Sequence, residues 1–228
     1  MTILLPDDRL ARSSVVANSS MNRERTLTGV NSYTRELGFD PALWLLDRGG
    51  EASWLDLCSG EGRALNAAAG RLPPGAVLTG IDLVGPLVPQ SAQGQVELIA
   101  ASLAEWRPDR PYDLITCVHG IHYLGDKLGT IARAASWLTP DGLFAAHLDP
   151  ASVRHPDGTS AARPVLTALR AAGFTYHSRR HLLVLRGRRD IELPFSYLGA
   201  DSAAGPNYTG QPAVASHYHR NLRSRTTR

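Results

Sequence analysis

Residues 56–62 read Asp56-Leu57-Cys58-Ser59-Gly60-Glu61-Gly62, and they decide the fold that we expect. A short apolar run, residues 53–57, leads into them, and a helix-like run, residues 63–69, follows. Small residues at a strand–helix junction let the backbone approach a ligand closely, and the helix N-terminus offers unpaired N–H groups. Alone, the stretch predicts either a nucleotide-binding turn or a tight turn without a ligand.

Strand-like and helix-like segments alternate after this loop. We expect strands at residues 76–82, 96–101, 112–118 and 143–148, and helices at 125–137 and 163–172. The strands are almost continuously apolar, which indicates a parallel sheet covered by helices on both faces. Two later strand-like segments, 181–185 and 191–197, have so short a link that they can pair only antiparallel. The expected α/β fold has five parallel strands and a C-terminal antiparallel hairpin.

Asp82 closes the second expected strand, about 20 residues after the loop. In dinucleotide-binding folds, an acidic residue at this place accepts hydrogen bonds from ribose hydroxyls, and a carboxylate can accept from two at once. The loop and the acid together indicate a cofactor that carries adenosine. An NAD-binding loop would read GxGxxG, and this pattern does not occur in the sequence.

The segment DLCSGEG resembles the cofactor motif of class I, Rossmann-like methyltransferases, an acidic residue followed by GxGxG. The resemblance continues in GID at residues 80–82, YDLITCVHGIHYL at 112–124 and ASWLTPDGLFAAHLD at 135–149. It implies a mostly parallel seven-stranded sheet and S-adenosylmethionine (SAM) as the cofactor, with S-adenosylhomocysteine (SAH) as the product. The cofactor is expected over the carboxyl ends of the first four strands, as in other open α/β sheets.

The resemblance also assigns residues to the cofactor. They are Tyr33, Asp56, Cys58, Ser59, Gly60, Gly62, Asp82, Leu83, Ser102, Leu103 and His119. Two positions depart from the family pattern. Cys58 stands in the place of the first glycine, and Ala101-Ser102 replace an acidic residue that often lies near the adenine amino group. We expect the Leu103 N–H and the Ser102 hydroxyl to hold adenine instead.

The segment His119-Gly120-Ile121-His122-Tyr123 follows the fourth expected strand, beside the expected methyl group. Methyl transfer from a sulfonium is an in-line displacement, so alignment supplies much of the catalysis. An oxygen nucleophile often also needs its proton removed, and histidine has a suitable pKa. We expect His122 to be the base, with His119 and Tyr123 as further candidates. The alternative is that one histidine contacts the cofactor and the other packs against the N-terminal region.

Composition narrows the classes of protein to consider. The chain is 43% hydrophobic and 20% charged, which is typical of a soluble globular protein. No apolar run approaches the roughly 20 residues that cross a bilayer, and the first residues do not resemble a signal peptide. We therefore expect a cytoplasmic protein without a membrane partner. The two cysteines offer no zinc-ligand spacing, so no metal is expected.

A chain of 228 residues fits one α/β domain with short extensions, as a monomer or a homodimer. We expect a flexible N-terminus at residues 1–21, a helical lid at 22–50, the SAM-binding domain at 51–200, and a substrate-side loop with a basic tail at 201–228. Within the last range, the polar and aromatic residues 205–212 are expected to border the substrate.

These expectations favour methyl transfer to an oxygen or nitrogen nucleophile of a small molecule. Two alternatives stay open. The C-terminal HYHRNLRSRTTR has four arginines and no acid, so an RNA or protein methyltransferase is the second hypothesis. Nucleic acid is not the expected partner, because no broad basic face interleaved with aromatics is evident. The third hypothesis is a SAM-binding protein that transfers no methyl group.

Overall fold

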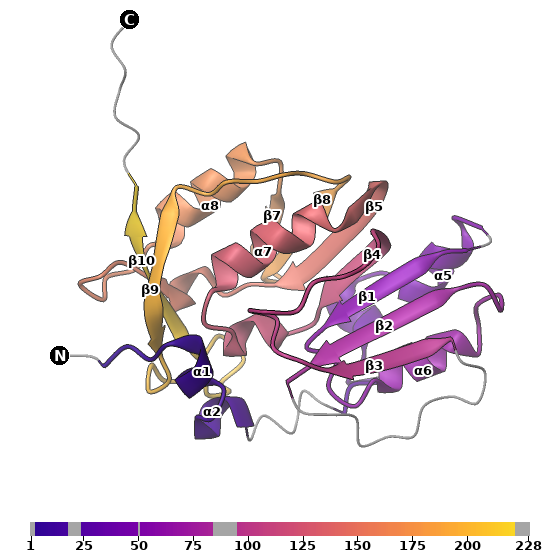
Figure 1. Cartoon of the computed structure of the whole chain (residues 1–228), viewed down its shortest axis with the longest axis horizontal. Coiled ribbons are helices and arrows are strands. Elements are labelled where there is room, and N and C mark those ends of the chain that lie inside the picture. Colours follow the sequence, from indigo (N-terminus) through magenta and orange to yellow (C-terminus); the bar gives the residue numbers. More distant parts are fainter. Residues whose placement is uncertain (1–2, 18–23, 50, 84–94, 222–228) are drawn as a thin grey trace, which may run out of the picture.

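The computed structural model describes residues 3–17, 24–49, 51–83 and 95–221 (Figure 1). Its main sheet has seven strands in the order β3-β2-β1-β4-β5-β8-β7. They are β1 (Ser53–Leu57), β2 (Val77–Asp82), β3 (Val96–Ala100), β4 (Tyr112–Cys117), β5 (Leu138–His147), β7 (Thr175–His177) and β8 (Leu182–Arg186). Strands β1 to β5 are parallel, and β8 runs antiparallel to both β5 and β7. The predicted mostly parallel seven-stranded sheet is confirmed.

Helices cover both faces of this sheet, as predicted. They include α4 (Tyr33–Leu37), α5 (Pro41–Leu46), α6 (Arg63–Ala69), α7 (Lys127–Ser136) and α8 (Ala162–Ala171), with the 3-10 helices η1 (Gly120–Tyr123) and η2 (Pro150–Ser152). Neighbouring residues of a strand point to opposite faces. Trp54 accordingly packs with Leu65 of α6 in one core, whereas Leu55 packs with Ile131 of α7 in the other.

A second sheet of three strands lies at the end of the molecule remote from β2 and β3 (Figure 1). Its order is β6 (Val153–Arg154), β10 (Ala215–Arg220), β9 (Phe195–Asp201). The predicted pairing of residues 181–185 with 191–197 is therefore wrong. β9 pairs with β10, and the closing hairpin of the main sheet is β7–β8.

The link after β8 explains the difference. The backbone N–H groups of Gly187 and Arg189 donate to the carbonyls of Gly142 and Ala135. These bonds turn the chain across β5 and α7 instead of back along β8. The link is short, but it is not the turn of a hairpin.

Residues 3–17, which we expected to be flexible, form α1 (Asp7–Leu10) and α2 (Ser14–Ala17) and dock on the small sheet. Leu5 exchanges backbone hydrogen bonds of 2.8 and 3.0 Å with Ala200, and Leu10 is buried against Ala200. Residues 1–2 and 18–21 of that range lie outside the described residues. In the described parts of the chain, no helix combines the length and the apolar character that crossing a membrane requires.

Candidate active site

Asp56 lies near the carboxyl end of β1 and is fully buried. Its Oδ1 accepts a 2.6 Å hydrogen bond from the Thr116 hydroxyl, because the register pairs these residues across β1 and β4. Its Oδ2 accepts a 2.6 Å bond from the hydroxyl of Tyr33 at the start of α4. Burial raises the pKa of Asp56 to about 7, although both hydrogen bonds oppose this rise. The carboxyl group thus joins the N-terminal helical region to the sheet.

Cys58, in the place of the motif's first glycine, has a φ of +58°. This left-handed conformation is uncommon for a residue with a side chain. Space for the side chain comes from Gly120 on η1, where an added Cβ would lie 2.3 Å from the Cβ of Cys58. A hydrogen bond with the Cys117 thiol, together with burial, raises the pKa of the Cys58 thiol. The atypical residue is accommodated by a glycine on another element.

Asp82 at the end of β2 accepts a 2.8 Å hydrogen bond from the Gly60 N–H through Oδ2. It lies on a cavity with a volume of about 100 Å³. The walls of this cavity include five of the residues that we assigned to the cofactor. They are Cys58, Asp82, Leu83, Ser102 and Leu103.

The chemistry of these walls fits an adenosine-bearing cofactor such as SAM. Asp82 offers a carboxylate suited to ribose hydroxyls, and Leu83 and Leu103 offer apolar surface suited to a base. The Ser102 hydroxyl already accepts a 3.3 Å hydrogen bond from the Ala104 N–H. Asp7 and Leu10 of α1 also line the cavity, whereas no described residue of the range 22–50, the expected lid, does so.

Other assigned residues lie on the strand–helix turn itself. The Ser59 N–H donates to the Ile81 carbonyl at 3.0 Å, and Gly62, with a φ of +71°, is the N-cap residue of α6. A Cβ on Gly62 would lie 2.6 Å from the Leu98 side chain, so the contact and the positive φ both favour glycine here. The roles of all these residues in cofactor binding stay predictions.

His119 lies two residues after the end of β4 and has a φ of +63°. Its Nε2 is 3.0 Å from Oε2 of Glu36 on α4, and its Nδ1 is 3.3 Å from the Tyr208 hydroxyl. The hydrogen bond with His119 lowers the pKa of Glu36 to about 2. Both ring nitrogens of His119 therefore have a partner, one in Glu36 and the other in Tyr208.

His122 and His147 are buried beside His119, with exposed fractions of 0% and 1%. The His147 ring stacks on His119 at a centroid distance of 4.2 Å, and the His119 and His122 centroids are 5.6 Å apart. None of the four ring nitrogens of His122 and His147 has a hydrogen-bond partner among the described residues. Burial lowers the pKa of His147 to about 3 and that of His122 well below its usual value. Both are neutral imidazoles at neutral pH.

His119, His122 and His147 form a histidine cluster, and Tyr208 covers it from the segment between β9 and β10. Its ring stacks on His181 at 3.7 Å and meets His122 edge-on at 5.3 Å. The segment is anchored because the Val214 N–H donates to the His122 carbonyl and the buried Lys127 ammonium donates to the Val214 carbonyl, both at 2.9 Å. Part of residues 205–212, which we expected to border the substrate, thus packs against the histidines.

The 3-10 helix η1 separates the cavity from the histidine cluster. Its Gly120 and Tyr123 line the cavity, whereas His122, on the same turn, lies among the histidines. The structure therefore brings the predicted catalytic residues His119 and His122 together and places Tyr123 on the cavity side.

The sequence patterns did not indicate two residues of this site, Glu36 and His147. His147 ends the fifth strand, and the rule that strand ends meet at one edge of the sheet could have identified it. Glu36 stands in a short helix before the first strand, where no motif marks it.

The sequence matches the model of a protein family described as "Methyltransferase domain" over residues 31–189. The chain belongs to this family. The match confirms the predicted class, a SAM-dependent methyltransferase with a Rossmann-like fold. No curated protein matches the sequence at a significant level.

Several solved structures are similar at low identity. The N-methyltransferase NodS from Bradyrhizobium japonicum WM9 is 18% identical with a TM-score of 0.46, over 68% of this chain and 95% of that chain. CalS10, an amino pentose methyltransferase from Micromonospora echinaspora solved with SAM, is 21% identical with a TM-score of 0.40, over 58% and 55%. The plantazolicin methyltransferase BpumL, solved with SAH, is 18% identical with a TM-score of 0.38; the match spans 46% of this chain but only 42% of BpumL.

Proposed function

We propose that this chain transfers the methyl group of SAM to an oxygen or nitrogen nucleophile of a small molecule. The observation that carries the proposal is the position of η1. Gly120 and Tyr123 face the cofactor cavity, while His122 on the same turn lies among the buried histidines. An acceptor bound at these histidines is one helical turn away from the cofactor.

The histidine cluster offers the groups that such a transfer needs. SAM, when bound, supplies an electrophilic methyl group, and the protein must align the nucleophile with it. His122 is the base in this proposal, since neither ring nitrogen has a partner in the described chain and the neutral imidazole can take the nucleophile's proton. Burial lowers its pKa, so it is a weaker base than an exposed histidine. His119, held by Glu36 and Tyr208, suits the orientation of the acceptor. Tyr123 suits a contact with the cofactor.

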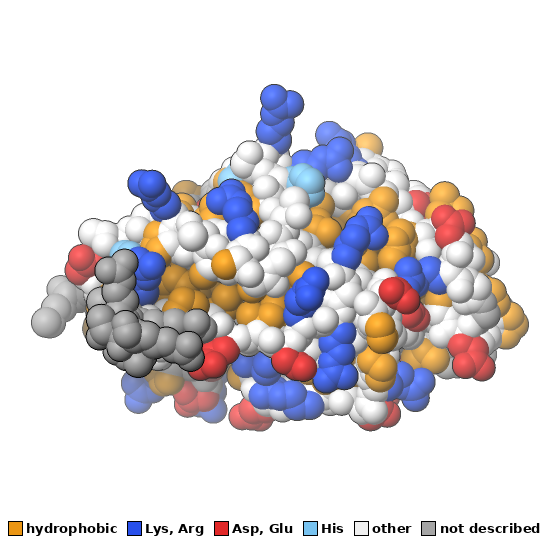
Figure 2. Space-filling view, turned by 90° about the horizontal axis from the view of Figure 1, so that it is seen from above, with side chains coloured by type: hydrophobic (Ala, Val, Ile, Leu, Met, Phe, Trp, Pro, Cys, Tyr) orange, Lys and Arg blue, Asp and Glu red, His pale blue; other side chains and the backbone are white. Residues whose placement is uncertain are grey.

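The enclosure of the cluster favours a small acceptor over a macromolecule. His119, His122 and His147 are each no more than 4% exposed, and the Tyr208 ring lies over two of them. On the face that Figure 2 shows, Lys and Arg side chains are dispersed among apolar and acidic ones. The alternative of an RNA or protein methyltransferase rests mainly on the arginines at 223, 225 and 228, which lie outside the described residues.

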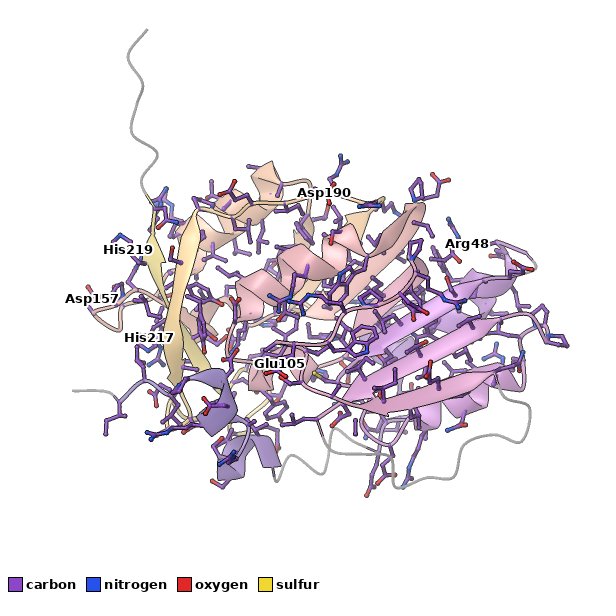
Figure 3. The ribbon with its side chains drawn as sticks, viewed as in Figure 1. Arg48, Glu105, Asp157, Asp190, His217 and His219 are labelled. Atoms are coloured by element: carbon purple, nitrogen blue, oxygen red, sulfur yellow. The ribbon has the colours of Figure 1, made fainter. Side chains whose placement is uncertain are left out.

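The test is an assay of the purified chain with SAM and a panel of phenols, alcohols and amines. We expect SAH to form and one acceptor class to gain the mass of a methylene unit. His122→Ala should lose turnover while SAH binding, measured by calorimetry, is retained. His219→Ala, an exposed histidine of β10 (Figure 3), is the matched control and should keep both.

Each alternative has its own outcome. If SAH binds but no acceptor gains mass, the chain is a SAM-binding protein without transfer. If truncation after His219 abolishes transfer to RNA at moderate salt, the macromolecular hypothesis replaces ours. Full turnover in His122→Ala would leave alignment alone as the mechanism.

A further inference from the structure

Three side chains from distant parts of the chain converge at the histidine cluster with their ligating atoms together. They are Glu36 from α4, His119 after β4 and His147 at the end of β5. One carboxylate oxygen and one nitrogen from each imidazole lie within 4.8 Å of one another. Both histidines are buried, so this group differs from an exposed surface ion pair.

The spacing of the atoms suits a single metal ion. Glu36 Oε2 is 3.0 Å from His119 Nε2 and 3.7 Å from His147 Nε2. Ligands that each lie about 2.1 Å from one cation are about 3.0–3.4 Å apart in octahedral or tetrahedral geometry. The two separations from Glu36 are close to this range, and the two imidazole nitrogens, which lie within 4.8 Å of each other, reach it when one ring turns.

The unpartnered nitrogens of His147 are an independent observation. Its side chain is 1% exposed, and neither ring nitrogen has a hydrogen-bond partner in the described residues. A buried polar group without a partner is unfavourable, and such groups call for an explanation such as an ion or a ligand. A cation beside Glu36 would satisfy the nitrogen that points toward it.

Two neighbouring side chains contact the proposed ligands. Arg25 forms a 3.0 Å ion pair with Oε1 of Glu36, so this bond leaves Oε2 toward the imidazoles. The Tyr208 hydroxyl lies 3.3 Å from Nδ1 of His119, as expected of a group that orients a ligating histidine whose Nε2 binds metal. The stacked rings of His119 and His147 require one ring to turn about its Cβ–Cγ bond. His147 can turn without losing a hydrogen bond.

We infer that Glu36, His119 and His147 form a binding site for a divalent transition-metal ion, with zinc as the best-matched ion. Two imidazoles and one carboxylate form a ligand set that binds zinc in other proteins. Magnesium and calcium prefer oxygen ligands, so two imidazoles disfavour their binding. Three protein ligands leave a coordination position open. In the proposed reaction, the acceptor's oxygen or nitrogen occupies that position and is held toward the methyl group. This role rests on the proposed function, whereas metal binding itself does not.

Calorimetric titration with zinc chloride tests the site directly. The tag-free full chain is first treated with a chelator and dialysed. We expect one bound zinc ion per chain in the wild type and at least tenfold weaker binding in Glu36→Gln, His119→Ala and His147→Ala. His219→Ala removes an exposed histidine on β10 (Figure 3) and should bind zinc like the wild type. Magnesium chloride should give no comparable binding.

Two results would overturn the inference: no zinc binding in the wild type, or equal binding in Glu36→Gln and His219→Ala. Glu36→Gln keeps the shape of a side chain that is 29% exposed, so it remains informative if His147→Ala does not fold. Replacing zinc by cobalt gives a visible absorption band in the wild type that should be lost in Glu36→Gln. SAH binding should be unaffected by the chelator. If SAH does not bind at all, this result would count against the proposed function and not against the metal site.

Discussion

The Tyr33 hydroxyl donates a 2.6 Å hydrogen bond to Oδ2 of Asp56, and this bond fastens the N-terminal helical region to the first strand. Tyr33 is buried and meets Trp54 edge-on at a centroid distance of 5.9 Å. The same short helix carries Glu36, which contacts His119. One contact therefore positions parts of both the cofactor loop and the histidine cluster.

Tyr33→Phe should destabilise the protein, because the ring is kept but a donor to a buried carboxyl group is lost. A hydrogen bond to a charged group contributes about 1.5–3 kcal/mol. We expect a decrease of this size in the free energy of unfolding, measured by urea denaturation at pH 8. Tyr112→Phe is the matched control, since the Tyr112 hydroxyl donates to a neutral partner, the Thr79 hydroxyl, at 3.0 Å. A loss no greater than that of the control would contradict the prediction.

Asp56→Asn should change how stability depends on pH. The pKa of Asp56 is raised to about 7 by burial, with Asp82 adding to the rise and Thr116 and Tyr33 opposing it. Between pH 4 and 7 the folded state keeps a proton that the unfolded chain releases. Wild-type stability therefore falls as the pH rises through this window and levels off above it.

The asparagine variant lacks this titration. Its stability relative to the wild type should increase from pH 4 to 7, by up to roughly 4 kcal/mol, because the pKa of Asp56 is raised to about 7 in the folded state. Denaturation curves at several pH values measure this difference. Asp190→Asn replaces an exposed acid (Figure 3) and should follow the wild-type profile. Parallel profiles for Asp56→Asn and the wild type would show that Asp56 is ionised throughout.

Asp82→Ala should weaken SAH binding about ten- to a hundredfold, as expected for a charge-assisted hydrogen bond of roughly 1.5–3 kcal/mol. The carboxylate also accepts the Gly60 N–H at 2.8 Å, so its removal loosens the loop as well. Calorimetric titration with SAH gives the affinity. Glu105→Ala, an exposed acid (Figure 3), controls for the change in net charge. Equal affinities in the two variants would mean that the ribose lies elsewhere.

Four of the five parallel strands could be predicted closely from the sequence because each is a short apolar run next to a turn, whereas β5 begins at Leu138 and not at residue 143. β1 begins and ends where the apolar run does, and β2 to β4 differ from their predicted ranges by one residue at an end. The carboxyl ends of such strands meet at one edge of the sheet. For this reason Cys58, Asp82 and Ser102 line one cavity, as the motif order indicated.

The rest of the site depends on contacts between distant residues that no local period marks. Leu5 pairs with Ala200, and Glu36 meets His119 and His147, across separations that sequence patterns do not report. The small sheet was missed for a similar reason. β6 has only two residues, and β9 pairs with β10 across a long polar segment without a two-residue turn.

Gly120→Ala should destabilise the protein, because its added Cβ has no room. The new atom would lie 2.3 Å from Cβ and 2.8 Å from Sγ of Cys58, and 2.9 Å from Sγ of Cys117. Overpacking of this kind typically costs about 1–3 kcal/mol. We expect a loss of that size in the free energy of unfolding, measured by urea denaturation.

Cys58→Gly should relieve the effect of Gly120→Ala. It removes two of the three close contacts and frees residue 58 from carrying a side chain at a φ of +58°. The double variant should therefore be more stable than the sum of the two single changes predicts, by about 0.5–3 kcal/mol of coupling energy. The four proteins of this cycle are compared under the same reducing conditions, so that neither thiol is oxidised. Additive losses would show that Cys58 is not the reason why residue 120 is glycine. The atypical cofactor loop would then be accommodated in some other way.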